Sequence, residues 1–191
     1  MTRYLALLRG INVGTANRIR MDALKRLFEN AGFYRVETLI QSGNVLFASP
    51  FAEEKTIRAI TEALKTSAGI ETAVVLRTAE EMKQLVGSSP FSVAEITEAQ
   101  RFTPEIESFH VCLLPEAPAE TALAKLASVS LEGDRYSVSG RDIYLLLPHG
   151  IRSSKLSIRL QRIFPDATLR NWNTISKLNE RINAAEETND V

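Results

Sequence analysis

The sequence predicts an α+β protein made of two ferredoxin-like βαββαβ units, each with an antiparallel sheet and an extra helix after it. Three observations lead to this fold class. Apolar, strand-like runs alternate with segments of helical periodicity, and the order of these segments is the same in both halves of the chain. Each half also contains a hairpin signal with a Ser-Gly pair, Ser42-Gly43 in the first and Ser139-Gly140 in the second.

The first half reads as strand, helix, hairpin, helix, strand and short helix. Apolar runs predict the strands, at residues 3–11, in the two arms of a hairpin at 36–49, and at 72–77. Helical spacing of apolar residues predicts helices that stop at glycine, at residues 21–31, 57–64 and 82–86. Thr78 and Glu81 have the spacing of a capping box, which would begin the last of these helices.

The second half repeats this order. Strands are predicted at residues 108–115, in a hairpin at 135–148 that turns at Gly140-Arg141-Asp142, and at 167–172. Helices are predicted at residues 123–127, at 156–164 before Pro165, and, as a final short helix, at 175–182. The expected organisation is therefore a first unit at 1–88, a linker without clear periodicity at 89–106, and a second unit at 107–191 that ends in a polar tail.

Composition narrows the class of protein. Lys plus Arg and Asp plus Glu both number 23, and this balance argues against a generic nucleic-acid coat or a membrane-surface protein, while a local basic patch stays possible. Cys112 is the only cysteine, so no internal disulfide can form. We expect a soluble, cytoplasmic protein, because we find no signal-peptide pattern and no apolar run long enough to span a membrane. His110 and Cys112 supply only two ligands, so no metal site is predicted.

Four ordered motifs resemble a known family. They are "LLRGINVG", "LIQSGNVLF", "PHGIRSSKL" and "TLRNWNTISKL", and together they resemble the bacterial domain of unknown function 1697 family along the whole chain. The resemblance implies a duplicated ferredoxin-like fold and carries no established activity. The chain departs from the family pattern at Thr15, where Gly is usual after Val-Gly, and at Ser89, where Asn is usual before Pro-Phe.

One candidate site is the junction "HGIRSSKLSIRL", residues 149–160. Ser153 or Ser154 is a natural N-cap for the helix that follows, and Arg152 and Lys155 flank it. Free backbone N–H groups and two cations could together hold a phosphate or a carboxylate. The alternative is an ordinary capped helix with exposed basic residues.

A second candidate is the loop "RGINVGTANRIRM", residues 9–21. It offers Arg9 and Asn12 beside Gly10 and Gly14, which permit close backbone approach. Its glycine spacing fits neither of the common nucleotide-binding fingerprints. The alternative is a turn that needs glycine and carries solvated arginines.

The third candidate is "TLRNWNTISKL", residues 168–178, which contains the only tryptophan. If the strand continues through Trp172, then Arg170 and Trp172 share one face of it. Arg170 and Asn171 would line a pocket with Trp172 as its wall. In the structural alternative, Trp172 is buried and Asn173 or Thr174 caps the last helix.

We expect these junctions to form one polar cleft. The expected ligand-binding residues are Arg9, Asn12, Arg152, Ser154, Lys155, Arg170, Asn171 and Trp172. The resulting hypothesis is binding of a small anionic ligand, either by a binding module or by an enzyme of undetermined reaction and unknown cofactor. The alternatives are nucleic-acid binding, disfavoured by zero net charge and by central strands without an RNP1-like pattern, and a structural or protein-interaction role.

Overall fold

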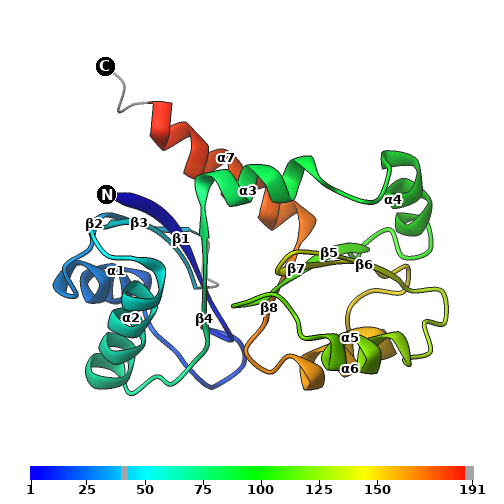
Figure 1. The fold of residues 1–191 in the computed structure, drawn as a ribbon, viewed down its shortest axis with the longest axis horizontal. Helices are drawn as coiled ribbons and strands as arrows, with labels where there is room; N and C mark the ends of the chain where they lie inside the picture. Colours follow the sequence, from blue (N-terminus) through cyan, green and yellow to red (C-terminus); the bar gives the residue numbers. More distant parts are fainter. Residues whose placement is uncertain (40–42, 188–191) are drawn as a thin grey trace. The chain divides into compact units, whose positions relative to one another are not determined.

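The computed structural model describes residues 1–39 and 43–187 and confirms the α+β fold class. It contains two four-stranded antiparallel sheets, with the strand orders β2-β3-β1-β4 and β6-β7-β5-β8 (Figure 1). In both, the first strand of the βαββαβ unit lies between the third and fourth, as the ferredoxin-like arrangement requires. By their contacts, the residues group into an N-terminal unit, 1–84 with 177–191, and a central unit, 85–176. The domain boundaries expected at residues 88 and 107 stay a prediction.

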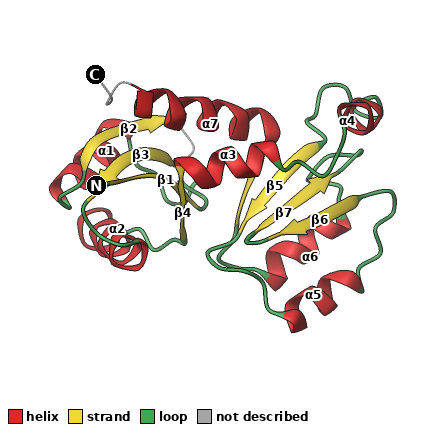
Figure 2. Cartoon of the chain, turned by 45° about the horizontal axis from the view of Figure 1, so that its top comes forward, coloured by secondary structure: helices red, strands yellow, loops and turns green. Residues whose placement is uncertain are grey.

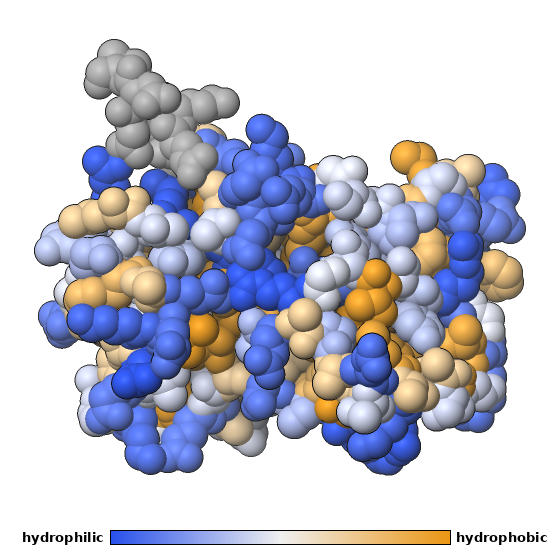
Figure 3. Space-filling view, in the orientation of Figure 1, coloured by the Kyte–Doolittle hydropathy of each residue, from blue (hydrophilic) through white to orange (hydrophobic). Residues whose placement is uncertain are grey.

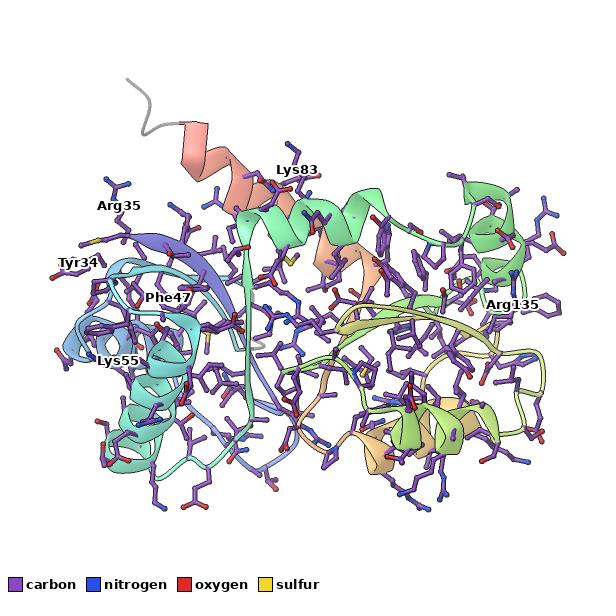
Figure 4. All side chains as sticks on the ribbon, viewed as in Figure 1. Tyr34, Arg35, Phe47, Lys55, Lys83 and Arg135 are labelled. Atoms are coloured by element: carbon purple, nitrogen blue, oxygen red, sulfur yellow. The ribbon has the colours of Figure 1, made fainter. Side chains whose placement is uncertain are left out.

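The N-terminal unit follows the predicted order of elements. Its strands are β1 (Thr2–Leu8), β2 (Tyr34–Leu39), β3 (Asn44–Ser49) and β4 (Val74–Thr78), and its first two helices are α1 (Met21–Asn30) and α2 (Glu53–Ala68). Both helices cover one face of the sheet, and Phe47 on β3 packs in the core between them (Figures 2 and 4). The prediction that these helices end at glycine is confirmed, because Gly32 and Gly69 follow them with positive φ. Of the first Ser-Gly pair, Ser42 lies outside the described residues.

The central unit repeats the plan. Its strands are β5 (Phe109–Leu113), β6 (Arg135–Ser139), β7 (Asp142–Leu146) and β8 (Thr168–Asn171), and the two helices on one sheet face are α5 (Glu120–Ala127) and α6 (Lys155–Ile163) (Figure 2). The predicted turn at Gly140 is confirmed, with a φ of 56°. Cys112 and His110 are both buried on β5.

Helix α3 (Ala79–Gly87) begins with the predicted capping box. The Thr78 backbone N–H donates to Glu81 Oε2 at 2.8 Å, and the Glu81 N–H donates back to Thr78 Oγ1 at 3.2 Å. This reciprocal pair satisfies two of the N–H groups that a helix start leaves without intrahelical partners.

Part of the expected linker is a helix, α4 (Val93–Gln100), that we did not predict. It begins with a second capping box, from Ser92 to Glu95. The pKa of Glu95 is lowered to about 2 by hydrogen bonds from the Ser92 backbone and hydroxyl and by the Arg135 guanidinium. Arg135 on β6 lies 2.7 Å from Glu95 Oε1 and 5.0 Å from the centre of the Phe91 ring, beside α4 (Figure 4). The helix is therefore fastened to the sheet by one ion pair and one cation–π contact.

The last helix, α7 (Trp172–Glu187), is longer than the short helix we predicted and begins earlier. Trp172 is its first residue, so the expectation that Arg170 and Trp172 share a strand face is wrong. Figure 3 shows hydrophilic side chains interspersed with hydrophobic patches on the visible face. Of the helices that the structure describes, none is both long and apolar enough to cross a membrane.

Candidate functional site

The connection from β7 to α6 is held in one conformation by the segment 103–106. Gly150 has a φ of 78°, and a Cβ added there would lie 2.8 Å from Ile106 Cγ2, so only glycine fits without displacement. The Thr103 hydroxyl donates to the carbonyl of Pro148 in the same turn. The residues that follow this turn therefore start from a fixed backbone.

Ser154 is the N-cap of α6, which decides between the two serines we considered. Its Oγ accepts the Ser157 backbone N–H at 2.8 Å and donates to Asp134 Oδ2 at 2.6 Å. Asp134 is buried, and burial raises the pKa of its carboxyl, while the hydrogen bond from Ser154 and the charge of His149 act in the opposite direction. The Ser154 hydroxyl is thus fully used in holding the helix and a buried acid together.

The solvent side of α6 and the turn before it carry a basic face, which we define as Arg152, Lys155, Arg159 and Arg162. The last three, with Ile158, border a groove of about 350 Å³ whose opposite wall is formed by residues 128–130. Lys155 Nζ lies 2.6 Å from Glu132 Oε1. Within the described part of the chain, the three arginines make no ion pair. Positive charge therefore gathers along one side of a groove without an internal acid to neutralise most of it.

In the N-terminal unit, the side chain of Asn12 and the backbone of Arg9 hold the loop that carries these predicted residues. The Asn12 side chain pairs with the backbone of Ile19, donating from Nδ2 to its carbonyl and accepting its N–H at Oδ1, both at 2.9 Å. The Arg9 backbone N–H donates to the Ala73 carbonyl at 3.1 Å, and the Arg9 carbonyl accepts the Thr72 hydroxyl. These contacts close the loop and anchor it beside β4.

The same loop borders a hollow of about 730 Å³, whose lining includes Asn12, Arg18 and Arg20. The Arg18 guanidinium donates twice to the Gly14 carbonyl, at 2.9 and 3.2 Å. Arg20 Nε lies 3.1 Å from Asp22 Oδ1. Both arginines are therefore engaged, Arg18 by the loop backbone and Arg20 by the first turn of α1, unlike the arginines of the basic face.

At the third junction, Arg170 is half-buried on β8 and donates from Nη1 to Thr168 Oγ1 at 2.7 Å and to the Leu169 carbonyl at 2.8 Å. Burial lowers its pKa to about 10. Asn171 caps α7, because its Oδ1 accepts the Thr174 N–H at 2.9 Å. The cap expected at Asn173 or Thr174 is therefore wrong, since the helix starts earlier than its apolar periodicity indicates.

Trp172 belongs to an aromatic cluster in the central unit. Its ring stacks on Phe109 with centroids 4.4 Å apart and an interplanar angle of 24°. Phe91 meets the same Phe109 edge-on at 5.7 Å, and the Tyr144 hydroxyl donates to the Leu85 carbonyl at 2.8 Å. In the "RNWN" segment, Arg170 therefore lies at the end of a strand, Asn171 caps a helix, and Trp172 packs in the aromatic cluster.

Three residues of this site were missed in the sequence. Arg159 and Arg162 follow Lys155 at the i+4 and i+7 spacing of one helix face, a signal that was present but not used. Asp134 had no comparable signal, because its partner Ser154 lies twenty residues further along the chain. Among the described residues, no group of three or more His, Cys, Asp or Glu side chains could hold a metal ion.

Comparison with known proteins places the chain in a family. Residues 1–144 match the family described as protein of unknown function (DUF1697). The chain belongs to this family. The DUF1697 match contains Arg9 and Asn12 and ends before the motifs "PHGIRSSKL" and "TLRNWNTISKL", so it covers less of the chain than the resemblance we expected.

The fold recurs in a solved structure, the conserved bacterial protein SP0830 from Streptococcus pneumoniae. The TM-score is 0.75 at 21% sequence identity, and the similarity covers 96% of this chain and 99% of the other. This likeness shows a shared fold for the DUF1697 chain. The comparison with curated proteins gave no match.

Proposed function

We propose that the chain binds an anionic, phosphate- or carboxylate-bearing ligand along the basic face of α6. The observation that carries the proposal is the absence of ion pairs, within the described residues, for Arg159 and Arg162 beside a groove of about 350 Å³, and for Arg152 in the turn before α6. Two like charges 4 Å apart repel by about 1 kcal/mol in water and by more where solvent is partly excluded. An anion in the groove would remove that repulsion.

This proposal keeps Arg152 and Lys155 from the expected site and adds two arginines. Ser154 positions the helix by its two hydrogen bonds. The larger cleft, with Arg9, Asn12, Arg170, Asn171 and Trp172, stays a prediction, because these residues are divided between the two units. Arg9 and Asn12 lie in one unit and the others in the second. We propose binding alone, assign no reaction, and leave the cytoplasmic location as a prediction.

Arginine suits such a ligand better than lysine does. The guanidinium is planar and can donate two parallel hydrogen bonds to a phosphate or a carboxylate. The face supplies three arginines, and Lys155 is the member that already has an acidic partner, Glu132. Specific anion recognition is therefore expected to depend mainly on the arginines.

The test is ligand-induced stabilisation. Tripolyphosphate and citrate are titrated against the full chain, and the free energy of unfolding is followed by thermal or urea denaturation. A ligand at a hundredfold excess over its Kd stabilises a protein by about 2.7 kcal/mol. We expect this gain for at least one of the two anions, and its loss in the double variant Arg159→Ala with Arg162→Ala.

Arg58→Ala is the matched control, since Arg58 is an exposed helical arginine of α2 in the other unit. It should retain the full gain. If neither anion stabilises the chain, or if the double variant responds as the unchanged protein does, the proposal is wrong.

A further inference from the structure

An exposed aromatic pair lies at the start of the same connection. The rings of Phe102 and His149 meet edge-on with centroids 5.7 Å apart and an interplanar angle of 75°, and Phe102 is 60% exposed. The contact between Ile106 and Gly150, and the Thr103 hydroxyl on Pro148, fix the backbone on both sides of the pair. Two rings therefore face solvent from a fixed support, so little ordering would be needed when a ligand binds them.

His149 of the aromatic pair and the basic face belong to one short stretch of chain. Between Pro148 and Phe164 the sequence has four Lys or Arg residues and no Asp or Glu. Lys155 and Arg162 are seven residues apart on α6, which corresponds to roughly 10 Å along the helix axis. Each strand of a DNA duplex carries one charge per about 3.4 Å of helix axis, and phosphates of an extended single strand lie farther apart, so a row of this length can meet about two phosphates of a single strand.

Zero net charge does not weaken this local attraction. Exposed charges separated by more than a Debye length, about 8–10 Å at ordinary salt, are largely screened from one another. Glu132 engages Lys155, and Asp134 is buried beneath Ser154, so neither acid neutralises the three arginines. A polyanion would therefore meet the basic face as a positive surface.

We propose that this surface binds single-stranded nucleic acid, with the backbone phosphates along the basic face of α6 and a base stacked on the Phe102–His149 pair. The proposal rests on the anion-binding function and names its ligand class. Cationic grooves bordered by exposed rings bind single strands without sequence preference, because every base has a face that can stack. A duplex hides those faces, and a polyphosphate lacks them, so the rings favour the single strand over both.

The experiment measures fluorescence anisotropy of three labelled polyanions of equal length with the full chain: an oligothymidylate, the corresponding abasic strand, and the oligothymidylate in a duplex. We expect the oligothymidylate to bind at least roughly fivefold more tightly than the abasic strand, the lower bound for stacking of one base. The logarithm of the oligothymidylate affinity should fall linearly with the logarithm of the salt concentration. The expected slope is about −0.7 for each phosphate that the protein neutralises.

Variants separate the two parts of the surface. Phe102→Ala should reduce oligothymidylate affinity to that of the abasic strand and leave the abasic affinity unchanged. Phe102→Leu keeps apolar bulk without a ring and should behave in the same way, which covers a stability loss in the alanine variant. Arg159→Glu with Arg162→Glu should lower the affinity for both strands at least tenfold. Tyr34→Ala, which removes an aromatic side chain that is 52% exposed on β2, and Arg58→Glu are the controls and should change neither affinity.

Equal affinity for the oligothymidylate and the abasic strand would overturn the inference and leave the anion-binding function standing. Tighter binding of the duplex than of the single strand would overturn it as well, as would a preference for poly-glutamate or for vesicles of anionic lipid. If none of these polyanions, nor tripolyphosphate or citrate, binds, both the inference and the proposed function are wrong.

Discussion

Ser154 and Asp134 share one hydrogen bond, with Ser154 Oγ 2.6 Å from Asp134 Oδ2. The same oxygen accepts the Ser157 N–H and caps α6. One hydroxyl group therefore satisfies a helix N-terminus and a buried carboxylate at once, and the basic face depends on both contacts for its position.

Ser154→Ala should destabilise the protein by about 1.5–5 kcal/mol. Loss of an N-cap costs about 0.5–2 kcal/mol, and a buried polar group left without its partner costs about 1–3 kcal/mol more. Urea denaturation at neutral pH measures the change. Ser153→Ala, at an exposed neighbouring position, is the control and should change the free energy of unfolding by less than about 0.5 kcal/mol. Similar values for the two variants would contradict the shared role of the hydroxyl.

Asp134 makes stability depend on pH in an unusual direction. Burial raises the pKa of its carboxyl, so between the unfolded value of 3.8 and the folded pKa the native state binds more protons than the unfolded chain. Stability contributed by the protonated form is therefore lost as pH rises through the folded pKa. Asp134→Asn keeps an acceptor for Ser154 without this titration. The stability of the variant relative to the unchanged protein should increase from about pH 4 toward neutrality, and a flat difference would contradict the burial effect.

His110 should have the opposite effect at higher pH. It is 6% exposed, its Nδ1 has no hydrogen-bond partner among the described residues, and burial lowers its pKa despite a hydrogen bond to the Ser108 backbone. As pH falls below about 6.5, His110 is protonated in the unfolded chain before it is protonated in the native state. The free energy of unfolding therefore decreases as pH falls below that value. His110→Phe should remove this loss, as measured by urea denaturation across the range. An unchanged acid sensitivity would assign it to other groups.

Substitution of Arg170 should mainly affect stability, whereas substitution of Arg152 should mainly affect anion binding. Arg170→Ala removes the donor to Thr168 Oγ1 and to the Leu169 carbonyl, and should lower the free energy of unfolding by about 1–3 kcal/mol. Arg152→Ala should change it by less than about 0.5 kcal/mol and weaken anion-induced stabilisation instead. The measurement is denaturation of both variants with and without tripolyphosphate. A stable Arg170→Ala protein that no longer responds to the anion would return Arg170 to the ligand site.

The two asparagines beside Trp172 provide a matched pair. Asn171→Ala removes the hydrogen bond from Oδ1 to the Thr174 N–H and should cost about 1 kcal/mol, whereas Asn173 is exposed on the first turn of α7 and Asn173→Ala should be close to neutral. Thermal unfolding of the two variants measures the difference. The reverse order would restore the cap originally expected at Asn173.

Local signals explain how much of this could be predicted. The periodicity of α1 and α2 and the glycines after them identified both helices, and the Thr78–Glu81 pair identified the start of α3, because these signals act over a few residues. The same kind of pair at Ser92 and Glu95 was present and overlooked, since the residues after it lack a strong apolar stripe. The start of α7 at Trp172 was misplaced, because a tryptophan packed on the distant Phe109 looks like a strand residue in sequence.

The site was predictable to a smaller degree. Arg152, Ser154 and Lys155 could be found because a serine cap and adjacent cations are local in sequence. The acid beneath them could not, since Asp134 reaches Ser154 only when the sheet and α6 are assembled. The same holds for the Phe102–His149 pair, whose members are brought together from distant segments.

Glu37 on β2 and Arg181 on α7 form an ion pair across 144 residues of sequence, within a unit that combines residues 1–84 with residues 177–191. At 5–20 residues per second, a ribosome needs roughly 7–30 s to proceed from one partner to the other. Throughout that interval the nascent N-terminal unit lacks the C-terminal half of α7. The N-terminal unit is therefore completed only after the whole central unit has been synthesised, although its sheet and its core with α1 and α2 are already present at residue 78.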